Sequence, residues 1–208
     1  FLDEVAEAGG MDLPELMRRT MGAARAVPLY DRGPVFDTGR ARGVIDKVCA
    51  MAGWTGRTKG AEGKGRGFGF YFSHSGYFAE IVDITVTQGT RIKVEKVYVA
   101  GDIGSQIINP MHAEQQVQGS VIDGLAQALA GQKIQQVDGA VTQKGFGDFP
   151  LLRIDAAPAE IEVAFENNDV PPTGLGEPAL PPVIPALANA IYAATGKRLR
   201  DLPLRLGA

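Results

Sequence analysis

The sequence predicts an α+β fold, an antiparallel or mixed sheet with helices packed on one face. Residues 67–99 place apolar side chains at every second position, as half-buried strands do. The segments 38–52, 110–130 and 183–195 instead repeat their apolar residues at helical spacing. The predicted order is helices, strands, helix, strands and helix, with no internal repeat, which is the order of an α+β domain.

Composition excludes several classes of function. The 208 residues are 45% hydrophobic and 22% charged, with a net charge of −3, which gives no basic surface for nucleic acid. No apolar run approaches the roughly 20 residues of a membrane span. The single cysteine, Cys49, excludes an internal disulfide and iron–sulfur ligation by this chain. The two histidines, His74 and His112, lack metal-site spacing, so we predict no protein metal ligand.

The first 53 residues predict three helices. Phe1–Ala8 has the apolar spacing of a helix that Gly9 ends, and because the chain starts inside it, we expect a piece of a longer product. Asp12 is the expected N-cap of a second helix through Met21. Residues 22–37 have no clear period and predict a loop. Thr38 is the expected cap of a third helix, whose core positions are Ala41, Val44, Ile45, Val48 and Ala52; Cys49 is expected to be a small core residue.

The glycine-rich stretch that follows could suggest a phosphate-binding loop. Residues 63–69 contain Gly-x-Gly-x-Gly-Phe-Gly, but a dinucleotide loop needs a preceding strand and a following helix. Here a strand, Phe68–Phe72, follows, so we reject a nucleotide site and expect a mobile approach to that strand. Residues 79–86 and 92–99 predict a hairpin around the turn at 88–90.

The next helix has two distinct faces. Asn109 is its expected N-cap and Pro110 its first residue. One face is apolar, and the other carries Gln116, Gly119, Ser120, Asp123 and Gln127. A small polar face suits close approach by another surface or a polar ligand, and it equally suits exposure to solvent. Beyond it we expect a hairpin around Asp138-Gly139, a strand at 160–165 and a final helix through Thr195 that Gly196 ends.

The loop at 171–182 places a single carboxylate, Glu177, among glycines and prolines just before the last helix. Prolines restrict the backbone and glycines allow close approach, so the loop is expected to be stiff. A stiff loop suits a reactive group that must be held in one orientation. The alternative is a proline-rich connector with a solvated glutamate.

The segment Gly174-Leu-Gly-Glu-Pro-Ala, with Pro-Pro-Val-Ile-Pro-Ala-Leu-Ala-Asn-Ala-Ile after it, resembles the C-terminal part of the molybdenum-binding subunit of the xanthine oxidase family. The isoquinoline 1-oxidoreductase beta subunit and its aldehyde dehydrogenase relatives are the nearest in pattern. The resemblance implies that Glu177 is the general base beside the molybdenum. It further implies that Gln116 and Gly119 contact the pyranopterin and that Gly176 lies against the cofactor.

This resemblance also implies an activity and its partners. Residues 1–58 would be a helical linker, the remnant of a preceding domain, and 59–208 the molybdopterin-binding C-terminal domain. The enzyme would hydroxylate an aldehyde or N-heteroaromatic carbon with oxygen from water. Its cofactor would be molybdopterin with molybdenum, in the cytosine dinucleotide form.

The implied partners are the remainder of the molybdenum subunit, an iron–sulfur subunit and a cytochrome electron acceptor. The isolated chain is expected to be inactive, and the bacterial cytoplasm and periplasm both stay open as its compartment. The alternative is a non-catalytic binding or assembly module that keeps the fold without the chemistry.

Overall fold

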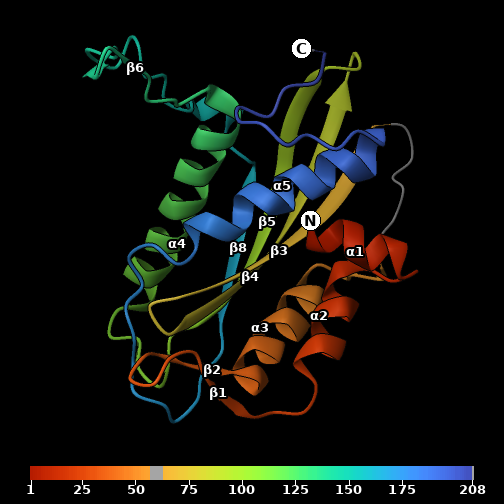
Figure 1. Cartoon of the computed structure of the whole chain (residues 1–208), viewed down its shortest axis with the longest axis vertical. Helices are drawn as coiled ribbons and strands as arrows, with labels where there is room; N and C mark the ends of the chain where they lie inside the picture. The colour runs from red at the N-terminus through yellow and green to blue at the C-terminus, as the bar shows by residue number, and fades with distance from the viewer. Residues whose placement is uncertain (57–62, 208) are drawn as a thin grey trace.

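A four-stranded sheet forms the centre of the computed structural model, which describes residues 1–56 and 63–207 (Figure 1). The strand order is β3–β4–β5–β8. The three long strands pair antiparallel, and β8 pairs parallel to β5. The strands are β3 (Lys64–Ser73), β4 (Gly76–Thr87), β5 (Arg91–Asp102) and β8 (Glu160–Phe165). The predicted mixed sheet and the α+β class are therefore confirmed.

Helices cover both faces of this sheet, which corrects the expectation of one covered face. One face packs against α1 (Leu2–Ala8), α2 (Leu13–Met21) and α3 (Thr38–Met51). The other packs against α4 (Pro110–Leu125), which runs into a π-helical turn at Ala126–Ala130, and against α5 (Leu180–Thr195). The reason lies in β4, where Tyr77 and Ile81 point to the first face and Phe78 and Val82 to the second. A strand that is apolar on both sides needs cover on both sides.

The glycines of the Gly-rich stretch lie inside β3, beneath α5. A Cβ at Gly65, Gly67 or Gly69 would overlap the α5 backbone, at the carbonyl oxygens of Ala190, Ala186 and Pro182 respectively. Because these glycines have no side chains, the backbone of α5 packs directly against β3. This corrects the expected mobile approach for residues 64–69; residues 57–62 of that stretch lie outside the described residues.

Two predicted helix caps are confirmed. The Asp12 carboxylate accepts a hydrogen bond from the Glu15 amide at 2.9 Å. The Asn109 side chain accepts from the His112 amide at 3.1 Å, with Pro110 at the first helical position. Each cap satisfies a backbone N–H that lacks a partner within the helix.

The start of α3 differs from the prediction. Asp37 is the N-cap and accepts from the amides of Gly39 and Arg40 at 2.7 and 3.0 Å. Thr38 lies inside the first turn, where its hydroxyl donates to the Ala23 carbonyl at 2.8 Å. Residues 22–37 also contain a short antiparallel pair, β1 (Ala26–Pro28) with β2 (Val35–Asp37), where a loop was expected. Three-residue strands are too short to show a period.

The predicted β4–β5 turn, the hairpin around Asp138-Gly139 and the last helix are also present in the structure. Gln88 and Gly89 form the β4–β5 turn with positive φ angles of 53° and 72°. The hairpin of β6 (Gln136–Val137) and β7 (Ala140–Val141) turns at Asp138-Gly139 and projects beyond the end of α4 (Figure 1). A 3₁₀ turn at Ile154–Ala156 precedes β8, and α5 starts three residues earlier than expected. Gly196 ends α5 in the left-handed conformation.

Cys49 is buried in α3, as expected for a small core residue. Burial raises the pKa of its thiol to about 11, so the thiol stays protonated at neutral pH and is a poor nucleophile. Among the described helices, none has both the length and the apolar character needed to cross a bilayer.

Candidate functional site

The Glu177 loop connects β8 to α5, and backbone hydrogen bonds hold it at several points along its length. Its Val170 carbonyl accepts from the Ser105 amide at 2.8 Å, and its Thr173 amide donates to the Ile103 carbonyl at 2.8 Å. The Glu177 carbonyl accepts from the Leu180 amide at 3.0 Å, where α5 begins. These bonds hold the backbone, while the Glu177 side chain is 76% exposed. The loop therefore presents a carboxylate from a fixed support.

Gln116 joins helix α4 to this loop. Its side-chain amide donates to the carbonyl oxygen of Gly176 at 2.7 Å. The two residues are 60 positions apart in sequence, yet the contact places the exposed side of α4 next to Glu177. The fold therefore brings together Gln116, Gly176 and Glu177, which the sequence singled out separately.

Gly119 lies one turn further along α4, on the exposed side. A Cβ added at Gly119 would meet no atom within 4 Å, and the same is true at Gly176. Ser120, in contrast, is buried and donates its hydroxyl to the Gln116 carbonyl at 3.0 Å. It therefore does not belong to the open face where the sequence placed it. A hydroxyl one turn from a helix carbonyl can satisfy itself locally, which removes the need for solvent.

His74 also reaches this site, although no sequence pattern indicated a role for it. It lies on the tight turn between β3 and β4, and its Nδ1 is 3.9 Å from Glu177 Oε2. The Ser73 hydroxyl is 2.7 Å from the same nitrogen. A lone histidine more than 100 residues from its partner has no spacing signal, and only the fold reveals the contact.

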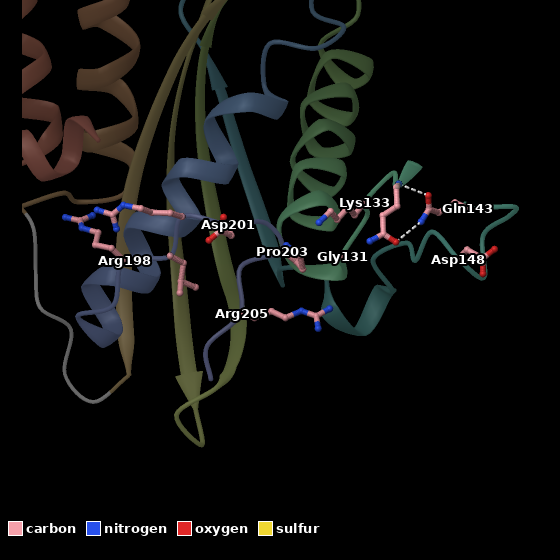
Figure 2. Close-up of a pocket in the computed structure, with 11 residues that line it drawn as sticks. Gly131, Lys133, Gln143, Asp148, Arg198, Asp201, Pro203 and Arg205 are labelled. Atoms are coloured by element: carbon pink, nitrogen blue, oxygen red, sulfur yellow. Dashed lines mark hydrogen bonds between the residues drawn. The ribbon is translucent and has the colours of Figure 1, made fainter. Parts of the chain in front are cut away.

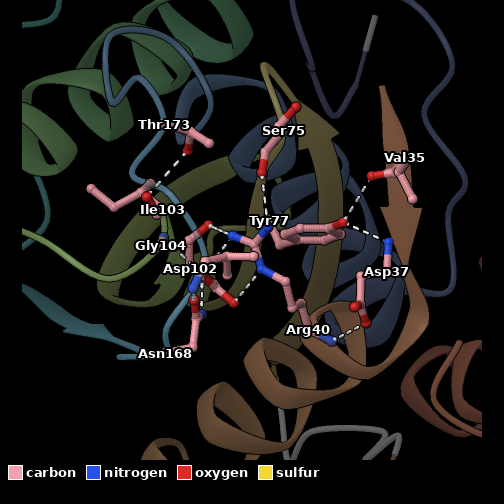
Figure 3. A network of polar contacts seen from close by, with 11 residues as sticks. Val35, Asp37, Arg40, Ser75, Tyr77, Asp102, Ile103, Gly104, Asn168 and Thr173 are labelled. Atoms are coloured by element: carbon pink, nitrogen blue, oxygen red, sulfur yellow. Dashed lines mark hydrogen bonds and ion pairs between the residues drawn. The ribbon is translucent and has the colours of Figure 1, made fainter. Parts of the chain in front are cut away.

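A buried ion pair lies under the turn and the loop (Figure 3). Arg40 of α3 donates from Nε and Nη2 to the two carboxylate oxygens of Asp102, at 2.9 and 2.7 Å. Asp102, only 2% exposed at its side chain, also accepts from the Gly104 amide at 3.0 Å and from Asn168 Nδ2 at 2.8 Å. Arg40 extends further to the Ser75 carbonyl at 3.4 Å. One carboxylate thus fastens α3, the end of β5 and the start of the Glu177 loop.

This network keeps Asp102 ionised. Burial by itself would raise the pKa of the Asp102 carboxyl, but the hydrogen bonds from Arg40, Gly104 and Asn168 outweigh burial and lower that pKa. Tyr77 supports the arginine, whose guanidinium carbon lies 4.6 Å from the ring centre. The Tyr77 hydroxyl in turn accepts from the Asp37 amide at 2.6 Å. The pair is therefore fully hydrogen-bonded, the condition under which a buried charge is tolerated.

A separate cleft of about 740 Å³ lies between the segment that follows α4, residues 131–148, and the C-terminal tail after α5, residues 198–205 (Figure 2). Its lining includes Lys133 and Arg205, but Arg198 and Arg200 are already paired with acidic residues of α1. Within residues 1–56 and 63–207, no three His, Cys, Asp or Glu side chains gather closely enough to hold a metal ion.

Residues 16–158 match the sequence model of the family described as "Molybdopterin cofactor-binding domain". This match covers more than half of the chain, so the chain belongs to that family. Gln116 and Gly119 lie within the matched residues, and Glu177 lies beyond them.

Individual relatives agree with this assignment. One nicotinate dehydrogenase subunit from Pseudomonas putida is 29% identical over 98% of this chain, which corresponds to 17% of that protein. The isoquinoline 1-oxidoreductase beta subunit from Brevundimonas diminuta is 29% identical over 80% of this chain and 21% of its own length. The chain thus spans about a fifth of these relatives.

Solved structures support the fold. Aldehyde oxidoreductase from Desulfovibrio desulfuricans aligns with 62% of this chain and 14% of its own, at a TM-score of 0.54 and 26% identity. CO dehydrogenase from Oligotropha carboxidovorans aligns with 58% of this chain and 16% of its own, at a TM-score of 0.50 and 26% identity.

Proposed function

We propose that this chain forms one wall of the active site of a molybdenum-dependent hydroxylase and that Glu177 is the general base of the reaction. The observation that carries the proposal is the 2.7 Å hydrogen bond from Gln116 to Gly176. It places the open face of α4 beside the one carboxylate of the Gly-Leu-Gly-Glu-Pro loop. A cofactor lying on that face would have Glu177 at its edge.

The residues present fit a molybdopterin. A pterin has a flat polar edge, so it needs close approach and hydrogen-bonding groups. Gly119 leaves open space on α4, and Gly176 does so on the loop. Gln116 uses one N–H on Gly176, which leaves its carbonyl oxygen and second N–H for a ligand. Gln116, Gly119 and Gly176 would therefore hold the cofactor.

The chemistry divides between cofactor and chain. The bound cofactor would supply a Lewis-acidic metal, an activated oxygen derived from water and an acceptor for two electrons. Glu177 would accept and hold a proton during the reaction, a role that suits a carboxylate in a site closed to water. The fastened loop would keep its carboxylate in one orientation.

The remaining assignments extend the proposal. We infer a substrate with an electrophilic carbon, an aldehyde or an N-heteroaromatic ring, in line with the names of the isoquinoline 1-oxidoreductase and aldehyde oxidoreductase relatives. The cofactor would be the cytosine dinucleotide form. The remainder of the molybdenum subunit would cover the exposed Glu177, and a separate iron–sulfur subunit, with a cytochrome beyond it, would take the electrons.

The test is Glu177→Gln in the assembled enzyme, because glutamine keeps the shape and cannot accept the proton. We expect turnover to fall at least about a hundredfold with molybdenum content unchanged. Glu114→Gln, an exposed glutamate of α4, is the matched control and should keep normal turnover. Near-normal turnover of Glu177→Gln would remove the assignment and favour a non-catalytic assembly module.

A further inference from the structure

We propose that His74 is a positioning residue of this active site, which pairs with the Glu177 carboxylate and orients it toward the open face of α4. The inference rests on the proposed role of Glu177 as the base. It assigns a function to the β3–β4 turn, which neither the sequence pattern nor the family description singles out. Four features of the molecule support it: the contact, the backbone of the turn, the shared support and the surrounding charges.

The contact joins two segments that are far apart in sequence. His74 Nδ1 lies 3.9 Å from Glu177 Oε2, so the two groups form an ion pair when the imidazole is protonated. The Ser73 hydroxyl, 2.7 Å from the same nitrogen, can donate to the neutral ring or accept from the protonated one. Nδ1 therefore keeps a partner in both charge states. Histidine is suited to such a role because its charge changes near neutral pH.

The backbone of the turn is unusual for its residues. His74 and Ser75 have φ angles of 52° and 62°, in the left-handed region that asparagine and glycine normally occupy in two-residue hairpins. Such a conformation is strained for most residues that have a side chain. Strain of this kind persists where the surroundings fix the segment, and it concentrates at functional positions. Histidine is one of the non-glycine residues that adopt this region more readily, so the turn can hold His74 in this position.

Both segments are fastened to the same buried ion pair. Arg40 donates to the carbonyl of Ser75, next to His74, and Asp102 accepts from Asn168, at the start of the Glu177 loop (Figure 3). The Arg40–Asp102 pair therefore fixes the position of the turn relative to the loop. The fold thus holds the imidazole next to the carboxylate.

The charges around His74 favour the same pairing. Arg40 of α3, which reaches the turn at Ser75, is paired with Asp102 through two hydrogen bonds. Asp37, at the start of α3, is occupied with the amides of Gly39 and Arg40. Among the described residues, the ion-pair partner of the His74 ring is the carboxylate of Glu177, at 3.9 Å.

The first test needs no cofactor. In the 208-residue chain, the ring resonances of His74 and His112 are recorded by NMR in the wild type and in Glu177→Gln at one pH. We expect the His74 resonances to shift and those of His112, the matched control on α4, to stay in place. If His74 does not respond, or if both rings shift equally, the pairing is wrong.

The second test uses the assembled enzyme and His74→Asn, since asparagine tolerates the left-handed turn. We expect kcat to fall about fivefold, which corresponds to the upper end of the free energy that an exposed ion pair contributes. KM should be unchanged. His74→Arg should restore much of the rate because it keeps the cation. His112→Asn should leave kcat unchanged. An unchanged kcat in His74→Asn would overturn the inference.

The two proposals can fail separately. In a Glu177→Gln background, His74→Asn should have no further effect on kcat, because His74 acts through that carboxylate. A further loss in the double variant would contradict that route. If Glu177→Gln alone keeps normal turnover, the base assignment fails, while the NMR comparison still decides whether the pair exists.

Discussion

The side-chain amide of Gln116 donates to the carbonyl oxygen of Gly176 at 2.7 Å, and this bond joins helix α4 to the loop that carries Glu177. The two partners come from segments that the sequence separates by 60 residues. The bond therefore fixes the distance between a helix face with open space at Gly119 and a carboxylate on a stiff loop. Changes to this arrangement, or to the packing that supports it, have measurable consequences.

Gln116→Ala should loosen the Glu177 loop. Removing a side chain–backbone hydrogen bond costs about 0.5–1.5 kcal/mol, and here the cost falls on the loop, not the core. We expect faster amide hydrogen exchange in residues 170–178 and little change in the sheet. Gln115→Ala, at the exposed neighbouring position, is the control. Equal exchange rates in both variants would show that the bond does not hold the loop.

Gly119→Leu should block cofactor loading without unfolding the chain. The site has open space, and leucine is favoured over glycine in a helix by about 0.5–1 kcal/mol, so thermal stability should be kept or increased. Molybdenum analysis of the assembled enzyme should show strong loss of metal. The control is Gly145→Leu, which is also at an open position but lies in the segment after the β6–β7 hairpin. This variant should bind molybdenum normally. Full molybdenum occupancy in Gly119→Leu would place the cofactor elsewhere.

Gly67→Ala should destabilise the contact between β3 and α5. The new methyl group would overlap the backbone of Ala186 and Ala190, which cannot move away as a flexible side chain can. Overpacking of this kind typically costs about 1–3 kcal/mol, and we expect the upper end or more. Denaturant unfolding measures the loss. Gly174→Ala, where a Cβ meets no atom within 4 Å, should unfold like the wild type, and equal stability of the two variants would contradict this packing.

Glu80 should make stability fall as pH rises. It is fully buried on β4, and neither carboxylate oxygen has a hydrogen-bond partner among the described residues. Burial raises the pKa of this carboxyl well above its ordinary value of 4.5. The folded state then binds more protons than the unfolded state. The stabilising effect of the protonated Glu80 is therefore fully present below about pH 4.5, and it is lost as the pH rises through the raised pKa of the folded state.

Glu80→Gln removes this dependence because glutamine does not titrate. Urea unfolding of both proteins at pH 5 and pH 8 should show the free energy of unfolding of the variant rising relative to the wild type as pH increases. Other titrating groups, including Asp102, cancel in the comparison. Parallel pH profiles would show that Glu80 is solvated or ionised in the folded chain.

Local chemistry made much of the fold predictable. The period of two indicated β3, β4 and β5, and short-range hydrogen bonding explains the caps at Asp12 and Asn109. The cover on both faces was missed because the strands were read as alternating, whereas β4 is apolar on both sides, with Tyr77 and Ile81 on one face and Phe78 and Val82 on the other. The glycines of β3 were misjudged because their partner, α5, lies more than 110 residues away in sequence.

The candidate site was predictable only in part. Glu177, Gln116, Gly119 and Gly176 came from a resemblance to a family, and their roles stay predictions. His74 has no signal in the sequence because its contact with Glu177 depends on a turn and a loop meeting in three dimensions. The division into residues 1–58 and 59–208 also stays a prediction.

The central claim is that Glu177 stands at the molybdenum in the assembled enzyme. Anomalous diffraction at the molybdenum absorption edge, on crystals of that enzyme, locates the metal without reference to any assumed mechanism. We predict a single peak next to the Glu177 carboxylate, with the pterin lying against Gln116 and Gly119. A molybdenum peak away from this loop, with Glu177 facing solvent, would contradict the account.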